Sequence, residues 1–168
     1  LIINPFFHSF GLKAGILACI IKGATIIPHP VFDVPSVMSR VDEEKVTMLP
    51  GPPAIYQTIL DHPDLANHDL STLRLAVTGA AAVPVEMIRR MREELTFETI
   101  VTGYGLTETT GIATMCRHDD DPEIISRTSG RAIPDVEVRV VDDDGTEVPT
   151  GQPGEVVVRG YNLMAGYY

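Results

Sequence analysis

The chain has 168 residues, of which 44% are hydrophobic, and a formal net charge of −10 at pH 7. This length and apolar content predict a globular protein with a buried core and exclude a disordered chain. The acidic balance argues against nucleic acid as a partner and against a basic membrane-surface patch, because both need clustered Lys and Arg. Any small anion that the protein binds must therefore be held by local geometry.

The start of the chain predicts a strand followed by a helix. Leu1–Ile3 reads as the middle of a strand, so we expect the sequence to be an internal piece of a longer polypeptide. The apolar run Gly15–Ile21 is too short to cross a bilayer and predicts a buried helix, and no transmembrane segment is expected. Cys19 and Cys116 lie far apart without metal-ligand spacing, which predicts reduced thiols in a cytoplasmic protein.

Short runs of β-branched and apolar residues predict strands, and amphipathic stretches between them predict helices. The predicted strands are Gly23–Ile27, Val46–Leu49, Leu73–Thr78 and Glu98–Thr102. The predicted helices cover residues 34–43, 52–59 and 84–95. A strand, a helix of this length and a second strand form a parallel crossover unit. We therefore expect an α/β fold with a parallel sheet and flanking helices.

Beyond residue 127 the pattern changes to short alternating segments that predict antiparallel strands. These segments are Val136–Val141 and Glu155–Arg159, with turn residues at 144–145 and 151–154 between them. We expect residues 1–127 to form the α/β part and residues 128–168 a small β-rich subdomain of the same domain.

Several polar residues are expected to be exposed to solvent and to have no catalytic or metal-binding role. Asp142–Gly145 lacks calcium ligands at the first and twelfth loop positions and predicts a hairpin tip. Asp119–Asp121, next to a proline, predicts a solvated loop. His29, His62 and His68 share no metal-ligand spacing and are expected to face solvent.

The stretch that is most informative about chemistry follows directly on the last predicted parallel strand, where open α/β sheets bind ligands. It consists of Gly103, Tyr104, Gly105, Leu106, Thr107 and Glu108. The glycines allow close approach of the backbone, the tyrosine offers a ring face, and the threonine and glutamate offer oxygens to a phosphate and to Mg²⁺. From spacing alone, a glycine-rich turn with a helix-capping threonine and a solvated glutamate explains the pattern equally well.

The segment Tyr104–Thr109 resembles the Tyr-Gly-x-Thr-Glu signature of the adenylate-forming superfamily, which includes acyl-CoA synthetases, luciferases and peptide-synthetase adenylation domains. Three further blocks agree in order and spacing, Asn4–Gly11, Val77–Pro84 and Gly151–Gly160, and the closing Tyr161–Tyr168 also fits. The resemblance covers essentially the whole chain. It implies part of the large N-terminal domain of such an enzyme, without the upstream phosphate loop, the downstream ribose-binding Asp and the C-terminal domain that bears the adenylation Lys.

The resemblance implies an ATP-dependent acyl-CoA ligase that uses ATP, Mg²⁺ and coenzyme A and forms an acyl-adenylate. Thr107 would bind the α-phosphate and Glu108 would bind Mg²⁺. Tyr104 and the backbone around Gly103 and Gly105 would line the adenine and the acyl-adenylate.

Gly79, Ala80 and Ala81 would form the other wall of that slot, although tight strand-to-helix packing also selects small residues there. His8 would lie beside the reacting carboxylate as a pocket gate or electrostatic helper. A general base is not required, since a substrate carboxylate is already ionised at neutral pH.

The substrate class stays open on the sequence. Phe7–Gly11 and Thr78–Ala81 look more like acyl-CoA ligases than amino-acid adenylation domains, which place an Asp near the first block. Phe32–Pro35, Leu49–Pro63 and Thr128–Arg131 are similar to actinobacterial ligases that activate the propanoate side chain of steroid-ring fragments. A medium- or long-chain fatty acid fits comparably well.

Alternatives from other classes are a non-catalytic relative that binds nucleotide or acyl ligand, and an adenylation domain for another carboxylate. A nicotinamide-dependent oxidoreductase is disfavoured because the three-glycine fingerprint is absent. Without the rest of the enzyme, the chain is expected to show little or no catalytic turnover. Its cut sheet edges would need partners, which is compatible with a homo-oligomer.

Overall fold

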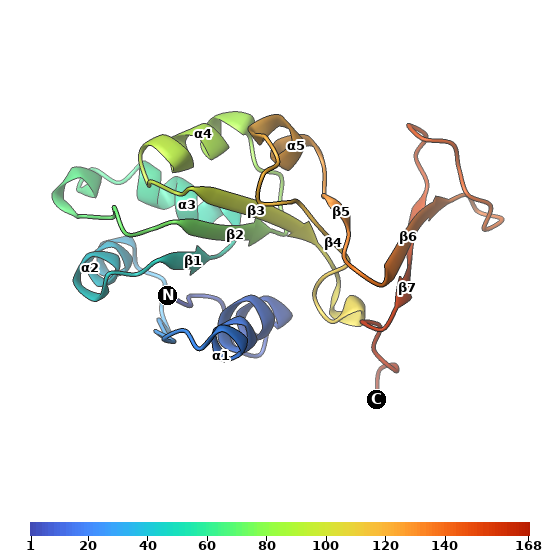
Figure 1. Cartoon of the computed structure of the whole chain (residues 1–168), viewed down its shortest axis with the longest axis horizontal. Helices are drawn as coiled ribbons and strands as arrows, with labels where there is room; N and C mark the ends of the chain where they lie inside the picture. Colours follow the sequence, from blue (N-terminus) through green and yellow to red (C-terminus); the bar gives the residue numbers. More distant parts are fainter.

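The short apolar runs form a central sheet in the computed structural model, which describes residues 1–168 (Figure 1). Its strands are β1 (Met48–Pro50), β2 (Leu75–Gly79), β3 (Thr99–Tyr104), β4 (Thr114–Met115) and β5 (Arg131–Ala132). They lie in the order β1-β2-β3-β4-β5, with β1 to β3 parallel and the short β4 and β5 added antiparallel. The predicted parallel sheet is confirmed for the strands predicted at 46–49, 73–78 and 98–102, which pair in parallel as β1, β2 and β3.

The helices lie close to where the amphipathic pattern predicts them. They are α1 (Ala18–Lys22), α2 (Val34–Glu44), α3 (Pro53–Leu60), α4 (Val85–Glu93) and α5 (Pro122–Arg127), together with a π-helical segment η1 (Gly11–Leu17) and two 3-10 turns, η2 (Leu65–Asn67) and η3 (Thr107–Thr109). Local caps explain two of the starts, because the Asp33 and Asp121 carboxylates accept hydrogen bonds from the amides of the first turns of α2 and α5. None of these helices has the length and apolar content that crossing a bilayer requires.

Helices α3, α4 and α5 cover one face of the sheet, and η1 with α1 lies on the other side (Figure 1). The main core forms under α3 and α4, where Tyr56, Ile88 and Met91 pack over Ala76 and Ile100 with no solvent exposure. Because the sheet is covered here along most of its length, its carboxyl end is the place where the chain opens toward solvent.

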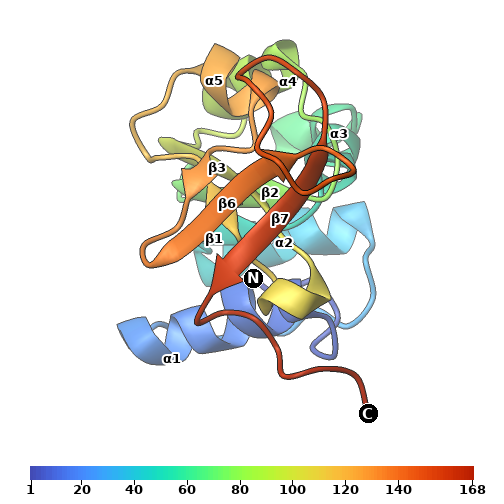
Figure 2. The same ribbon diagram turned by 90° about the vertical axis from the view of Figure 1, so that its right-hand side faces the viewer.

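A second sheet of two antiparallel strands, β6 (Val136–Val141) and β7 (Glu155–Gly160), lies beside the first (Figure 1) and faces the viewer in Figure 2. The predicted hairpin tip is confirmed, since the Gly145 amide donates to the Asp142 carbonyl over 3.0 Å. The strand β5 lies beyond residue 127 and still belongs to the five-stranded sheet. The position of the boundary between the α/β part and the β-rich part therefore stays a prediction.

Two predictions for the first 30 residues are wrong. Gly23–Ile27 forms no strand, because only Ile2 lies alongside, and it makes a single parallel bridge with Pro28. The helix predicted at 15–21 exists but is not buried, with Ile20 and Ile21 64% and 78% exposed. Gly15, close to the Ile2 side chain, is buried, whereas Ile20 and Ile21 lie on the side that no other element covers.

Two predictions of exposed polar residues are also wrong. His29 is only 6% exposed, and its backbone amide donates to the Ile2 carbonyl, so the segment that carries it lies alongside the first residues. Asp120 is buried and accepts a hydrogen bond from the Arg117 amide over 2.7 Å, while Asp121 caps α5. The acidic run is thus a structural turn between β4 and α5.

Replacing Tyr56 by Phe should destabilise the fold by about 1–2 kcal/mol, because it removes the donor to a buried carbonyl. The Tyr56 hydroxyl donates to the Leu49 carbonyl over 2.7 Å and ties α3 to β1. Denaturant unfolding of the two proteins measures the difference. Tyr161→Phe is the control, because Tyr161 is 74% exposed and should change stability by less than about 0.5 kcal/mol. Equal losses for the two variants would contradict the assignment.

Candidate functional site

The carboxyl ends of β2 and β3 approach each other without intervening side chains. Gly79 and Gly103 are register partners, and a Cβ at Gly79 would lie 2.6 Å from the Gly103 carbonyl oxygen. A Cβ at Gly103 would meet the Ile112 side chain at 2.6 Å. Close approach of the facing backbone thus explains glycine at position 79, and the nearby Ile112 side chain explains it at position 103. The two chains diverge directly after this contact and open a space between them.

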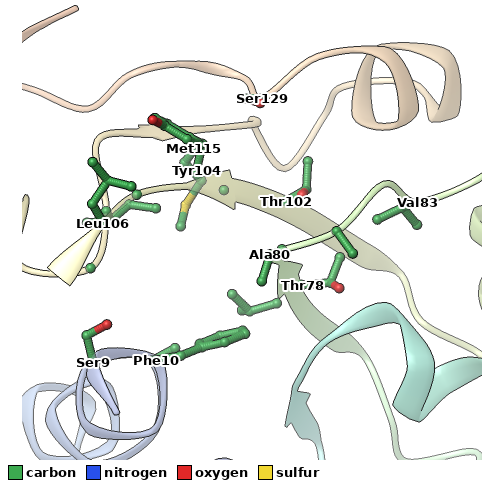
Figure 3. A pocket seen from close by; sticks show the side chains of 18 of the residues that line it. Ser9, Phe10, Thr78, Ala80, Val83, Thr102, Tyr104, Leu106, Met115 and Ser129 are labelled. Carbon is green, nitrogen blue, oxygen red and sulfur yellow. The ribbon is translucent and has the colours of Figure 1, made fainter. Parts of the chain in front are cut away.

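That space is a cavity of about 890 Å³. Its walls come from the ends of β2 and β3, the start of η1 and the end of α5. Figure 3 shows Ser9 and Phe10 facing the strand ends from one side, and Ser129 on the opposite side. Of the residues predicted for the site, eight line it: His8, Gly79, Ala80, Ala81, Gly103, Tyr104, Gly105 and Thr107. Glu108 does not line it.

One wall is made by Ala80 and Ala81, which follow β2, and another by Tyr104, which ends β3 (Figure 3). Ala80 has φ of +66°, a left-handed conformation that is uncommon for residues with a Cβ. Such strained residues cluster at functional sites. The turn after β2 therefore places two small exposed residues at the rim of the cavity.

His8 lies at the mouth of the cavity and is exposed. Its Nδ1 atom accepts a hydrogen bond from the Phe10 amide over 3.1 Å. A neutral imidazole in this arrangement carries its proton on Nε2, so His8 offers a donor to a ligand. This geometry suits an electrostatic helper better than a general base.

In the loop after β3, Thr109 and not Thr107 caps the 3-10 turn η3. The Thr109 hydroxyl accepts from the Leu106 amide over 2.9 Å and donates to the Leu106 carbonyl over 3.0 Å. Thr107 is exposed at the start of the turn and is not the capping residue. Its hydroxyl remains available to a ligand, against the interpretation of Thr107 as a structural cap.

Glu108 directly follows Thr107, which lines the cavity, and its carboxylate contacts the end of the chain. Its Oε1 atom accepts a hydrogen bond from the Tyr167 hydroxyl over 2.7 Å. This bond lowers the pKa of Glu108, with a smaller contribution from its own backbone amide, and raises the pKa of Tyr167. Glu108 is therefore not simply solvated, and its Oε2 atom is left for another partner.

The residues 160–168, which we call the strap, fasten the loop that carries Thr107 and Glu108. Asn162 is 6% exposed, and its Nδ2 atom donates to the carbonyls of Thr109 and Ile112 over 3.2 and 2.7 Å. The strap contains two residues that the sequence did not single out, Asn162 and Tyr167. The only signal for them was that the closing block matched the superfamily, and it assigned them no chemistry.

The donor set around Glu108 fits Mg²⁺ better than a structural transition metal. Nowhere in the chain do three His, Cys, Asp or Glu side chains gather around one point. Mg²⁺ is commonly held by one or two carboxylates, with water and substrate phosphates completing its shell. One carboxylate with a free oxygen, in the residue that follows an exposed threonine, meets that requirement.

A protein-family model described as "AMP-binding enzyme" matches residues 1–168. The chain belongs to the AMP-binding enzyme family. Its relatives include two propanoyl:CoA ligases whose acyl group carries a 7a-methyl-1,5-dioxo-octahydro-1H-indenyl ring system. The protein of Rhodococcus jostii (strain RHA1) is 56% identical over 99% of this chain and 30% of its own length. That of Mycobacterium tuberculosis (strain H37Rv) is 51% identical over 99% of this chain and 31% of its own length.

The architecture described above is shared with a solved CoA ligase structure. The anthranilate CoA ligase AuaEII in complex with anthranoyl-AMP has a TM-score of 0.85 and 29% identity, covering 94% of this chain and 30% of that protein. The chain therefore spans about 30% of the length of the relatives that it matches. The resemblance drawn from its motifs is confirmed at the level of the family.

Replacing Asn162 by Leu should release the strap and destabilise the protein by about 1–3 kcal/mol, because the Ile112 carbonyl loses its donor and the Thr109 carbonyl keeps only the Ile112 amide. Amide hydrogen exchange should become faster between Leu106 and Ile112, and denaturant unfolding should give the size of the loss. Asn67→Leu is the control, since Asn67 is exposed and bonds only to Asp64. Unchanged exchange in the loop would show that the strap does not hold it.

Proposed function

We propose that the chain forms the nucleotide- and acyl-binding part of an ATP-dependent acyl-CoA ligase. The reaction joins a carboxylic acid to coenzyme A through an acyl-adenylate and releases AMP and pyrophosphate. The observation that carries the proposal is that residues from three separate sequence blocks line one cavity at the carboxyl ends of parallel strands. The CoA-ligase activity in the names of two relatives supports it.

The adenine and acyl parts of the adenylate would lie between Ala80–Ala81 and the ring of Tyr104. The cavity volume of about 890 Å³ supports this, since it falls in the range of pockets that enclose a nucleotide-sized ligand. Thr107 would donate its hydroxyl to the α-phosphate, and its exposed, uncommitted side chain supports that role. Gly103 and Gly105 would let the backbone run close to the ligand.

The chemistry would depend on positioning and charge neutralisation. A carboxylate oxygen of the acid attacks the α-phosphorus of ATP, the bond to pyrophosphate breaks, and the acyl-adenylate forms. The coenzyme A thiol then attacks the acyl carbon and AMP leaves. His8 would donate a hydrogen bond from Nε2 at the mouth of the cavity, and Thr107 would hold the phosphate during both steps.

Glu108 would hold Mg²⁺ through its Oε2 atom, together with water and phosphate oxygens of ATP. When bound, the ion would neutralise charge on the phosphates. We further propose that a longer polypeptide supplies the phosphate loop, the ribose-binding Asp and the adenylation Lys that the superfamily uses, with the division near residue 127 lying inside one domain. A cytoplasmic location is supported by the two free cysteines, and exposed sheet edges are compatible with a homo-oligomer.

The proposed substrate is a propanoate attached to an oxygenated ring system. The identities of 56% and 51% to ligases named for such an acyl group support it over a straight-chain fatty acid. Large ring systems also differ from fatty acids in the shape of pocket that they require, so the two classes should be separable by kinetics.

Replacing Glu108 by Gln in the full-length enzyme should lower acid- and CoA-dependent AMP formation at least about 100-fold, because it removes the charge that holds the metal. The variant keeps an Oε1 atom that can accept from Tyr167, so its melting temperature should match the parent's. Glu86→Gln is the control, since Glu86 is exposed on α4. Full activity of Glu108→Gln would contradict the assignment of Glu108 as the Mg²⁺ ligand.

A panel of acids tests the substrate class with the same full-length enzyme. We expect kcat/KM for the 7a-methyl-1,5-dioxo-octahydroindenyl propanoate to exceed that for octanoate and palmitate by at least about tenfold. Pyrophosphate release measures each rate with ATP and coenzyme A held constant. If a fatty acid is the best substrate, the ring-bearing substrate class is wrong but the ligase activity stands. If none of the acids supports turnover, a non-catalytic binding protein is favoured.

A further inference from the structure

Both ends of Glu108 are held by the same segment of the strap. Its backbone carbonyl accepts a hydrogen bond from the Met164 amide over 2.9 Å, and its Oε1 atom accepts from the Tyr167 hydroxyl over 2.7 Å. The strap is itself anchored upstream, where the Thr110 hydroxyl donates to the Asn162 carbonyl over 2.6 Å. The direction of the Glu108 carboxylate is therefore set by residues more than 50 positions later in the chain.

The partner of Glu108 is a neutral hydroxyl, although the side chain is a carboxylate. Arg90, Arg159 and Lys45 each bond to acidic side chains elsewhere in the chain, whereas the groups that act on Glu108 are the Tyr167 hydroxyl and its own backbone amide. The negative charge is thus oriented but not neutralised. A phenol that occupies one oxygen leaves the second oxygen and the full charge for a cation.

We propose that Tyr167 is a positioning residue that orients Glu108 for Mg²⁺, an inference that rests on the proposed function. Hydrogen bonds from neighbouring groups commonly fix metal-binding carboxylates, and their loss costs about 10–100-fold in metal affinity or activity. Tyr167 binds Oε1 and restricts Glu108 to one-oxygen ligation through Oε2. The remaining positions around the ion are then free for water and the phosphates of ATP, as Mg²⁺ requires.

The strap does not depend on the Tyr167 hydroxyl for its position. Tyr167 is 76% exposed, and its hydroxyl makes the only bond of its side chain to the loop. The backbone bonds of Asn162 and Met164 hold the strap without it. Removing the hydroxyl should therefore leave the fold and the loop in place and change only the freedom of the Glu108 carboxylate.

The test compares Tyr167→Phe with Tyr161→Phe in the full-length enzyme, since Tyr161 is equally exposed and makes no side-chain hydrogen bond to Glu108. Mg²⁺ binding is measured directly by calorimetry, with a non-hydrolysable ATP analogue present. Tyr167→Phe should weaken Mg²⁺ binding about tenfold, whereas Tyr161→Phe should not change it. In turnover assays the Mg²⁺ concentration for half-maximal rate should rise by the same factor, and the rate at saturating Mg²⁺ and the KM for the acid should stay the same.

Three other results of these measurements would contradict the role of Tyr167. Equal Mg²⁺ affinity for the two tyrosine variants, with Glu108→Gln inactive, overturns the role of Tyr167 and keeps the proposed function. A loss of kcat in Tyr167→Phe that excess Mg²⁺ does not restore, or a lower melting temperature with faster exchange in the loop, also overturns it, because the effect is then structural. Full activity of Glu108→Gln contradicts the assignment of Glu108 as the Mg²⁺ ligand, and the role of Tyr167 falls with it, whereas the acyl-CoA ligase function is tested separately by the panel of acids.

Discussion

The close approach of β2 and β3 at Gly79 and Gly103 is the constraint on which the rest of the site depends. A Cβ at Gly79 would lie 2.6 Å from the facing carbonyl oxygen, so no other residue fits there without moving a strand. Because the strands are parallel and in register, the segments that leave them start from the same edge of the sheet. Ala80 and Tyr104 consequently become opposite walls of one cavity rather than parts of separate loops.

The loop after β3 is held both by its own hydrogen bonds and by a distant segment of the chain. It is short, it contains only the 3-10 turn η3, and its position is maintained by the strap, which returns from β7. Hydrogen bonds from Asn162 and Met164 satisfy carbonyls that the loop leaves without internal partners. The β6–β7 hairpin thus serves the site by delivering the strap, and this links the β-rich part of the chain to the α/β part.

Much of the fold followed from local patterns, and much of the rest depends on distant pairing. Runs such as Leu73–Thr78 and the amphipathic face of α4 predict their elements because hydrophobic periodicity is a local property. The exposure of Ile20, the burial of His29 and the bond from Tyr167 to Glu108 depend on which segments lie side by side, and no local signal encodes that. The Tyr-Gly-x-Thr-Glu block predicted a site residue set that lines one cavity, except Glu108, whose direction is set by the strap. The chemical roles of these residues stay predictions.

A crystal structure of the full-length protein with a non-hydrolysable acyl-adenylate analogue would show whether the ends of β2 and β3 hold an acyl-adenylate. We expect the adenine between Ala80–Ala81 and the Tyr104 ring, and the phosphate mimic within hydrogen-bond distance of the Thr107 hydroxyl. An analogue bound elsewhere, with this cavity unchanged and filled only by solvent, would refute the proposed binding site.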